Sequence, residues 1–510
     1  MFVIRVLGRL ATGRTGAALC AAVVGVVSLG FYLATLAPGL TWAHDSADGG
    51  ELAVAASTLG IPHPPGYPTY VLLAHSFTLL PVGEVATRTN LFSAACAAGA
   101  AALLTWTLAR TARNYAAAVG AGLALAFSPL LWAQATVTEV HTLNALFTAL
   151  MLALTALTEP ARMFVIRPHR PPRRAALLAL AVGGTWGLSL GNHPTALFCG
   201  PLVLLALWRL RRFRPLGAAG IVLGLSVYLY LPLRAAADPP LNWGDPQTLE
   251  RFWWMVSGAL YRHFLFSLSW AYLPARLLAW AGLLTQQFSG AGIIVVVPGA
   301  ILLWTVKRPF LVVTATTVAM CSVFAIGYDT TDSYLYLVPG LVCLGLWLGV
   351  GADWLVGEVA KRTRWLAWVI AVLAVGLPLA AAVYRFPMLD LSDDRAARDF
   401  GDAILGEAPS EAVVLSRRDT HTFALWYFRY AHGLRPDVVV VDLGLLGYDW
   451  YAAHLSRRLA VPVPVDVLMA PQEESLRQAA EVLDRPVCWI DWEWTGLSCA
   501  GTQRRQSDTD

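Results

Sequence analysis

Long apolar runs separated by short polar segments fill the first 384 residues of the chain. A helix needs roughly 20 mostly apolar residues to cross a bilayer, and about eleven runs approach that length. The first run is too long for the apolar core of a cleaved signal peptide, which has about 7 to 15 residues. The pattern predicts a polytopic α-helical membrane domain over residues 1–384, with spans at 17–37, 89–109, 116–134, 142–158, 175–191, 194–208, 215–233, 287–306, 309–327, 335–352 and 365–384.

Basic residues cluster between these spans. Cytoplasmic loops carry an excess of Lys and Arg, so the clusters predict which segments lie inside. The N-terminus is then cytoplasmic, the intervening segments face outward, and an odd number of crossings places the C-terminal region outside. The clusters are Arg5–Arg14, Arg110 with Arg113, Arg162–Arg174, Arg209–Arg214, Lys307 with Arg308, and Lys361–Arg364.

Composition also indicates a membrane protein. Of the 510 residues, 57% are hydrophobic and only 14% are charged, and the mean hydropathy is +0.57. Soluble domains carry about 25% charged residues, so the composition excludes an ordinary soluble protein. The formal charge of +4 lies mostly in the clusters between spans, which indicates topology and not a nucleic-acid partner. Lys307 and Lys361 are the only lysines, which is typical of a GC-rich bacterial genome and therefore predicts a plasma (inner) membrane location.

The composition changes after about residue 385. The last 126 residues hold 20 of the 33 acids, and β-rich apolar runs such as EAVVLS and PDVVVVDL alternate with helix-like stretches. That alternation predicts a small extracytoplasmic α/β domain over residues 385–510. Cys488 and Cys499 lie in this region, where an oxidising compartment permits a disulfide, but their spacing leaves the pairing open.

Two outer segments are longer than simple connectors. Residues 38–88 contain a short helix-like stretch, the turn HPPGYP and a second amphipathic stretch, TYVLLAHSFTLLP. Residues 234–286 contain LRAAADPPLNWGDP and an aromatic-rich stretch that suits the lipid interface. We therefore expect amphipathic helices in the first outer loop.

The first outer loop concentrates acids in a membrane domain where acids are scarce, with Asp45, Asp48 and Glu51. In a helix, Asp48 and Glu51 share one face near its positive N-terminal end, because they are three residues apart. Adjacent carboxylates at a membrane surface raise each other's pKa, so one of them is a candidate general base, with Asp45 the least favoured acid. The alternative is that Asp48 or Asp45 only caps the helix.

The turn HPPGYP follows these acids. Its prolines exclude a helix and Gly66 permits a reversal, so the turn directs the chain back along the membrane surface. The shape of the turn does not require a histidine. His63 is therefore a candidate for binding a phosphate or a sugar hydroxyl, with Tyr67 beside it, and the alternative is that His63 only packs on Tyr67.

Polar residues also occur at the predicted outer ends of later spans. Glu139 with His141, and Asn192 with His193, are candidates for substrate binding, because ionisable residues at membrane depth are often functional. The alternative for each site is a hydrogen-bonded pair that ties two helix ends together. His63, His141 and His193 could assemble a metal site with the acids, but the sequence has no short metal-ligand spacing such as HExxH, so a required metal is the less favoured interpretation.

Arg234 and Asp332 complete the candidate set. Arg234 lies on the outer side, against the positive-inside trend, where it could hold a lipid-linked phosphate or only extend to the lipid interface. Asp332, in YDTTDSYLYLVP, is a candidate for lining one substrate-binding cavity together with these residues, and the alternative is that it only caps the next span. Together these features are what a membrane enzyme that uses a polyprenyl-phosphate sugar needs.

The same residues carry a resemblance to a known family. The motifs are, in order, DGGELAVAASTLGIPHPPGYPTYVLL, EVHTLNALFTAL, GNHPT, YLPLRAAADPPLNWGDP, YDTTDSYLYLVP and RPDVVVVDLGLLGYDWYAAHL. They resemble the bacterial relatives of the eukaryotic transmembrane protein O-mannosyltransferase of plexin-type receptors, a family of GT-C glycosyltransferases. The resemblance runs from about residue 30 to about residue 460, and the first motif is the most specific.

The resemblance implies a GT-C fold with an active site open to the extracytoplasmic side, and a sugar on a polyprenyl phosphate, with mannose expected, as the donor. The family's first motif, close to tryptophan-aspartate-x-glycine-glutamate, maps onto Asp48, Gly50 and Glu51. Here Ala47 replaces the tryptophan and Asp45 adds a third acid. Catalysis is assigned to Asp48 and Glu51, with Asp48 favoured as the base.

The resemblance also implies an inverting mechanism. The base takes a proton from the acceptor hydroxyl while the oxygen attacks the anomeric carbon, and Arg234 and His193 steady the departing phosphate. Because a polyprenyl phosphate is already a good leaving group, no metal or other cofactor is expected. The expected partners are the lipid-linked sugar, membrane lipid and an exported protein, with a glycan or lipid as the alternative acceptor.

Two interpretations from other classes stay open. A transporter or flippase would also place charges at membrane depth, but it usually has internal repeats and broken helices, which this sequence does not show. A non-catalytic receptor or scaffold would use the C-terminal domain for binding. It would be indifferent to Asp48→Asn, whereas an enzyme would not.

Overall fold

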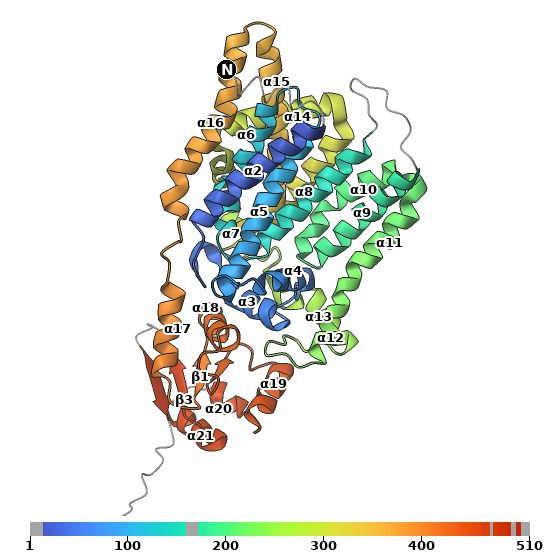
Figure 1. Cartoon of the computed structure of the whole chain (residues 1–510). Coiled ribbons are helices and arrows are strands. Elements are labelled where there is room, and N and C mark those ends of the chain that lie inside the picture. The colour runs from blue at the N-terminus through green and yellow to red at the C-terminus, as the bar shows by residue number, and fades with distance from the viewer. Residues whose placement is uncertain (1–13, 160–171, 470–472, 491–495, 501–510) are drawn as a thin grey trace, which may run out of the picture.

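A computed structural model describes residues 14–159, 172–469, 473–490 and 496–500. A bundle of long helices forms most of the molecule, and a small domain of strands and helices lies at one end of the bundle (Figure 1). The basic clusters predicted at 5–14 and 162–174 fall mostly outside the described residues.

The bundle follows the predicted apolar runs. Its helices are α2 (Arg14–Ala34), α5 (Val85–Ala109), α6 (Tyr115–Ala126), α7 (Pro129–Ala135), α8 (His141–Thr158), α9 (Pro172–Leu190), α10 (Gly200–Arg209), α11 (Arg214–Leu225), α14 (Leu273–Gly327), α15 (Val338–Ala360) and α16 (Arg364–Leu389). Within the described residues, seven helical segments are long and apolar enough to cross a membrane, and eight if α6 and α7, bent by 62°, form one span. The protein is therefore a multi-pass membrane protein.

The sequence predicted about eleven spans, which is more than the seven or eight helical segments counted among the described residues. The predicted span at 175–191 corresponds to α9, and the one at 194–208 corresponds to the shorter apolar helix Pro194–Arg209, which includes α10. Within the described residues, neither helix alone counts as long and apolar enough to cross a membrane. The predicted spans at 287–306 and 309–327 both fall within the 55-residue α14. The backbone of α14 is non-helical at Lys307, two residues before Pro309, which removes a helix hydrogen bond. The break therefore lies at the basic pair where the sequence predicted a turn.

Small residues let the bundle helices approach closely. The alanine-rich α5 packs against α2, α6 and α8, and α9 packs along α11. At Gly183 in α9, an added Cβ would lie 2.0 Å from the carbonyl oxygen of Gly217 in α11, so the two backbones are in direct contact. Membrane helices associate largely through such close van der Waals packing.

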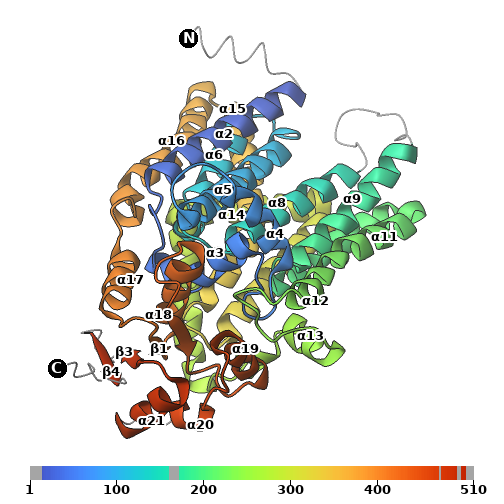
Figure 2. The ribbon, with the colours of Figure 1, turned by 60° about the horizontal axis from the view of Figure 1, so that its bottom comes forward.

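Both outer loops are partly helical and lie at the end of the bundle that faces the small domain, as Figure 1 and Figure 2 show. The first loop contains the expected helix beside the acids. The first loop holds η1 (Ala43–Asp45), α3 (Gly49–Thr58) and α4 (Pro68–Thr78), and the second holds α12 (Tyr230–Ala235), α13 (Leu249–Val256), η5 (Ala259–Phe264) and η6 (Trp270–Tyr272).

The small domain is built on a four-stranded sheet in the order β2-β1-β3-β4. Strands β1 (Val413–Ser416), β2 (Val439–Asp442) and β3 (Val487–Ile490) are parallel, and β4 (Leu497–Ala500) is antiparallel to β3. Its helices are α17 (Ala396–Glu407), α18 (Asp419–Trp426), α19 (Asp449–Leu459), α20 (Val465–Met469) and α21 (Glu473–Leu483). β1 and β2 are fully buried, which accounts for their unbroken apolar runs.

The predicted α/β domain is therefore confirmed. Cys488 of β3 and Cys499 of β4 lie opposite each other in the sheet and form a disulfide, which settles the pairing that the sequence left open.

The small domain contacts both outer loops. Helix α18 packs on α3, and an added Cβ at Gly50 would lie 2.4 Å from the carbonyl oxygen of Phe423, so the two backbones touch there. An ion pair joins the second outer loop to α19, because Asp238 lies 3.1 Å from His454 and 3.0 Å from Arg457.

We expect Gly50→Ala to weaken the docking of the small domain. The new methyl group would clash with backbone atoms, and overpacking typically costs about 1–3 kcal/mol. Thermal unfolding in detergent and limited proteolysis between α16 and α17 should show a lower melting temperature and faster cleavage. Gly406→Ala, where nothing lies within 4 Å of the added Cβ, is the matched control. Equal behaviour of the two variants would contradict a close contact at Gly50.

Candidate active site

Asp48 lies at the N-terminal end of α3 with an open carboxylate. It is the N-cap residue, but its side chain makes no capping hydrogen bond with the described residues. The side chain keeps 38% of its surface exposed, and protein encloses the rest. Helix capping, the alternative to a chemical role, therefore does not account for Asp48.

Glu51, one turn later, has a different environment. Its side chain is 0% exposed, and its carboxylate accepts hydrogen bonds from the backbone N–H of His63 at 3.1 Å and from Nδ1 of His63 at 2.5 Å. A buried carboxylate without a partner is costly, so this pair holds both the turn and the histidine ring in place. The structure thus separates the two acids that the sequence assigned jointly to catalysis, since Glu51 contacts His63 and is closed to a substrate.

His63 connects the buried Glu51 to the open Asp48. Its Nε2 lies 2.9 Å from the hydroxyl of Tyr67 and 3.7 Å from Oδ2 of Asp48. Burial lowers the pKa of His63, but the charges of Asp48 and Glu51 outweigh burial and raise the pKa to about 9. Burial raises the pKa of Asp48, and the charge of His63 opposes that rise. At neutral pH His63 is therefore an imidazolium that favours the ionised form of Asp48.

A cluster of rings continues from Tyr67 to the ends of the bundle helices. Tyr67 stacks on His193 with 6.1 Å between ring centroids, and Tyr336 lies 5.5 Å from His193 and 5.9 Å from His141. These residues come from the start of α4, from the turn before η2 (Pro194–Cys199), from α8 and from η7 (Ser333–Leu337). The histidines that the sequence placed at separate helix ends thus meet at one site.

His193 is held in one tautomer. Its Nδ1 lies 2.7 Å from the hydroxyl of Thr195 and accepts the backbone N–H of Thr195 at 3.2 Å. The Thr195 hydroxyl itself accepts a hydrogen bond from Asn144 at 2.9 Å, so it donates to His193. Burial, together with His141 and His63, lowers the pKa of His193 well below its ordinary value. The ring is therefore neutral and carries its hydrogen on Nε2, where it can donate.

Glu139 and Asn192 are buried at the same end of the bundle. The Glu139 carboxylate accepts the N–H of Val140 at 3.2 Å, and burial, with the charge of Asp48, raises the pKa of Glu139. Asn192 donates to the carbonyl of Val140 at 3.2 Å and so ties two helix ends together. Its side-chain oxygen has no hydrogen-bond partner among the described residues, so it can still accept a hydrogen bond.

Asp45 and Asp332 lie at the edge of this site. Asp45 accepts a hydrogen bond from the hydroxyl of Tyr334, which joins η1 to η7. Asp332 is the residue before η7, and its negative charge raises the pKa of Asp48. Substrate binding by either acid stays a prediction.

Arg234 makes a different contact from the one that the sequence suggested. Its guanidinium donates to the carbonyl oxygens of Leu59 at 2.7 Å and Thr58 at 3.2 Å, at the C-terminal end of α3. A cation there satisfies free carbonyls and opposes the negative end of the helix dipole. The observed contacts are therefore structural, and phosphate binding by Arg234 stays a prediction.

Another cation lies near the ring cluster and escaped the sequence analysis. Arg276, in α14, donates to the hydroxyl of Ser333 at 3.0 Å and to the carbonyl of Tyr328 at 2.9 Å. The ring of Tyr328 is 5.4 Å from that of Tyr336. A guanidinium has five N–H donors, so Arg276 can contact an anion as well as these two groups.

Three further residues near the acids were also missed. The rings of Tyr261 and Trp243 lie 5.8 Å and 6.1 Å from that of His63. Asp419, the first residue of α18, has a pKa raised by burial and by Asp48, which indicates that the small domain contributes charge to the site. The aromatic-rich stretch was a signal for Tyr261. No local signal indicated that Asp419 would meet the first outer loop.

Comparisons with known families agree with these motifs. The model of the protein O-mannosyl-transferase TMEM260 N-terminal domain matches residues 48–214, and that of TMEM260-associated domain 2 matches residues 397–484. Together they cover 255 of the 510 residues, from the acid-bearing loop to the small domain. The chain belongs to the TMEM260 family. The resemblance carried by the sequence motifs is thereby confirmed.

Two curated TMEM260 relatives show how far the likeness extends. Protein O-mannosyl-transferase TMEM260 of Mus musculus is 30% identical over 442 residues, which cover 81% of this chain and 61% of the relative. Protein O-mannosyl-transferase tmem260 of Dictyostelium discoideum is 23% identical, over 86% of this chain and 60% of the relative. The chain thus spans about 60% of the length of these relatives.

Solved structures identify the fold of this TMEM260 family member. ArnT from Cupriavidus metallidurans matches with a TM-score of 0.56 in the apo state and 0.55 when bound to undecaprenyl phosphate, at 15% and 16% identity. Both matches cover 85% of this chain and 91% of ArnT. The predicted GT-C fold is confirmed.

We expect Glu51→Gln to lower stability most at acidic and neutral pH. In the folded protein the pKa of His63 is about 9, above its ordinary 6.5, and burial raises the pKa of Glu51 from 4.5 to about 7. The stability contributed by His63 is complete below pH 6.5 and is lost as the pH rises through about 9, and the raised pKa of Glu51 acts in the same direction. The advantage of the wild type over the variant should shrink across this range.

Thermal unfolding in detergent as a function of pH is the measurement. Glu473→Gln, which changes a carboxylate that is 78% exposed, is the control. A difference between wild type and Glu51→Gln that does not change with pH would contradict the coupling.

Proposed function

We propose that this protein transfers mannose from a polyprenyl-phosphate donor to a Ser or Thr hydroxyl of an exported protein. The curated relatives are named protein O-mannosyl-transferases, and ArnT, which shares the fold, has been solved bound to undecaprenyl phosphate. These names support the reaction class, the donor class and the acceptor.

The placement of Asp48 is the observation that carries the proposal. Its carboxylate is open, makes no capping bond with the described residues, and lies 3.7 Å from an imidazole that Glu51 holds in place. A general base must be reachable by the acceptor and ionised near neutral pH, and these contacts favour both conditions. A transporter or scaffold has no need for a buried carboxylate that orients a histidine toward a second, open carboxylate.

The proposed reaction inverts the anomeric carbon. Asp48 takes the proton of the acceptor hydroxyl while the hydroxyl oxygen attacks that carbon. The bond from the carbon to the phosphate oxygen breaks, and the phosphate leaves with the bonding electrons. The Nε2–H of His193 and the guanidinium of Arg276 stabilise the charge that develops on the phosphate. The charge of His63 favours the ionised form of Asp48 against the effect of burial, and Glu51 keeps His63 in position.

The proposed location is the extracytoplasmic face of a plasma membrane, with the N-terminus in the cytoplasm. The first outer loop and the small domain lie at one end of the bundle (Figure 1), and the positive-inside rule assigns that end to the outside. The Cys488–Cys499 disulfide supports this orientation, because disulfides persist in oxidising compartments.

We expect Asp48→Asn to lower sugar transfer by about 100-fold or more, the typical contribution of a general base. Membranes containing either protein would receive radiolabelled polyprenyl-phosphate mannose, and label would be counted separately in exported proteins and in extracted lipids. Asp402→Asn, which changes a carboxylate that is 52% exposed on α17, is the matched control. Label in lipid or glycan instead of protein would contradict the proposed protein acceptor and identify a lipid or glycan as the acceptor. Transfer that is unaffected by Asp48→Asn would exclude Asp48 as the base.

We also expect transfer to continue after divalent metals are removed. Among the described residues, no group of three or more His, Cys, Asp or Glu side chains is placed to hold a metal ion. The polyprenyl phosphate is a good leaving group, so the reaction does not require a Lewis acid. Transfer would be measured after EDTA treatment and desalting, with and without added Mg²⁺ or Mn²⁺. A loss of activity that one metal restores would contradict the proposal.

A further inference from the structure

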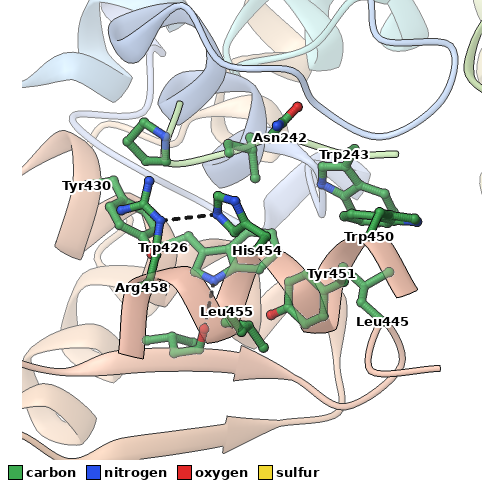
Figure 3. A pocket seen from close by; sticks show the side chains of 13 residues that line it. Asn242, Trp243, Trp426, Tyr430, Leu445, Trp450, Tyr451, His454, Leu455 and Arg458 are labelled. Carbon is green, nitrogen blue, oxygen red and sulfur yellow. Dashed lines mark hydrogen bonds between the residues drawn. The ribbon is translucent and has the colours of Figure 1, made fainter. Parts of the chain in front are cut away.

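Two cavities of this protein differ in what they can hold. Figure 3 shows the first, between residues 240–243 and the small domain, where Trp243 and Trp450 lie beside each other. Its volume is about 20 Å³, which is room for about one water molecule. The second lies inside the bundle among α6, α14, α15 and α16, and its volume is about 190 Å³. Of the two, only the second can hold a molecule larger than water.

The second cavity, which we call the bundle groove, is apolar except at one end. Of the described residues that line it, only Gln287, Ser289 and Arg385 have polar side chains. The guanidinium of Arg385 donates to the carbonyl oxygens of Phe127 and Gln286, each at 2.7 Å, so Arg385 lies beside Gln287. The bundle groove is therefore an apolar channel with a cation at one end.

Arg385 lies at the depth of a membrane surface. Helix α16 begins at Arg364, in a basic cluster, and Arg385 follows 21 residues later, about 31 Å along the helix. Gln286, whose carbonyl oxygen Arg385 contacts, lies the same number of residues before the break at Lys307 in α14. The hydrocarbon core of a bilayer is about 30 Å thick, so both helices place Arg385 near the head groups on the side of the small domain.

The bundle groove has the length and the width of one alkyl chain. Along α16 it extends from Ile370 to Arg385, which are 15 residues or about 22 Å apart. Bonds of about 1.5 Å give an extended chain about 1.25 Å per carbon, so this length holds about 16 to 18 carbons. Spread over this length, the 190 Å³ open to the centres of water-sized spheres makes a channel roughly 3 Å in radius. An alkyl chain needs about 2 Å, half the contact distance between carbon atoms.

Arg385 has donors left for the head group of a lipid. Its side chain is partly exposed, and the two carbonyl contacts use two of its five N–H groups. None of the acids in the described part of the chain forms an ion pair with it. A guanidinium without a counter-charge at head-group depth attracts a phosphate, which it can bind through paired hydrogen bonds.

We propose that the bundle groove binds an anionic phospholipid of the leaflet nearer the small domain, with one acyl chain along α16 and the phosphate on Arg385. The groove fits one acyl chain, whereas the chain of a polyprenyl phosphate is several times longer. The bound lipid fastens α16, which is mostly exposed to the membrane, to the rest of the bundle. Because α16 leads to the small domain, the lipid also steadies the position of that domain.

This site is separate from the proposed donor site. Arg276, which we place at the donor phosphate, lies 11 residues before Gln287, about 16 Å away along α14. The binding of a phospholipid therefore goes beyond the proposed transfer of sugar and does not depend on it.

The test is native mass spectrometry of the full-length protein in detergent. Dioleoyl phosphatidylglycerol, with 18-carbon chains and a net negative charge, is the probe, and zwitterionic dioleoyl phosphatidylcholine is the comparison. The wild type should retain one phosphatidylglycerol and bind it about fivefold more tightly than phosphatidylcholine, the typical effect of one Arg on an anionic lipid.

Two variants separate the head group from the chain. Arg385→Gln should weaken the binding of phosphatidylglycerol about tenfold, because a charge-assisted hydrogen bond is lost, and it should remove the preference over phosphatidylcholine. Ala381→Phe keeps Arg385 and fills part of the groove, so it should weaken both lipids roughly tenfold, the effect of losing contact with about two CH₂ groups. Arg364→Gln, at an exposed arginine at the other end of α16, is the matched control and should bind like the wild type.

Unchanged binding of phosphatidylglycerol in Arg385→Gln or in Ala381→Phe would overturn the proposal, and so would an equal loss in Arg364→Gln. If Arg385→Gln does not fold, Ala381→Phe decides. Displacement of phosphatidylglycerol by a lower concentration of polyprenyl phosphate would assign the groove to an isoprenoid chain and would also contradict the proposal. The measurement involves no transfer of sugar, so a failure of the proposed function leaves its result intact.

Discussion

A carboxylate closed off from solvent controls the geometry of the candidate site. Glu51 is fully buried, and both of its described hydrogen bonds come from His63, one from the ring and one from the backbone. Moving the turn that carries His63 would leave a buried charge unpaired, which is strongly unfavourable. Arg234 holds the opposite end of α3, because it donates hydrogen bonds to the carbonyls of Leu59 and Thr58. The turn is therefore fixed relative to the helix that carries Asp48.

This pair divides the work between two acids that are only three residues apart. Glu51 faces the interior and orients a positive His63, whereas Asp48 faces the open side and lies within reach of that charge. A reacting base must be accessible, and a group that orients another residue works best when buried, where water does not compete for its hydrogen bonds. One helical turn is enough to place the two carboxylates in these different environments.

The small domain forms part of the candidate site. It touches α3 where Gly50 meets Phe423, and it brings Asp419 close enough to change its pKa through the charge of Asp48. It also supplies Trp450, whose ring lies 5.9 Å from that of Trp243. Both TMEM260 family models match this chain, one on each side of the contact. The candidate site is therefore built by both parts of the chain.

The sequence by itself determined the features that depend on local pattern. Apolar runs of bilayer length specify membrane helices, alternating apolar and helix-like segments specify the α/β domain, and the motifs from Asp48 to His193 identify the family. The tertiary structure decided everything that depends on a side chain's surroundings. It alone separated Glu51 from Asp48, and it alone brought Asp419 to the first outer loop. Burial and charge at a residue are set by its neighbours in space, such as His63 for Glu51 and the far more distant Asp419 for Asp48, and spacing along the chain does not specify those neighbours.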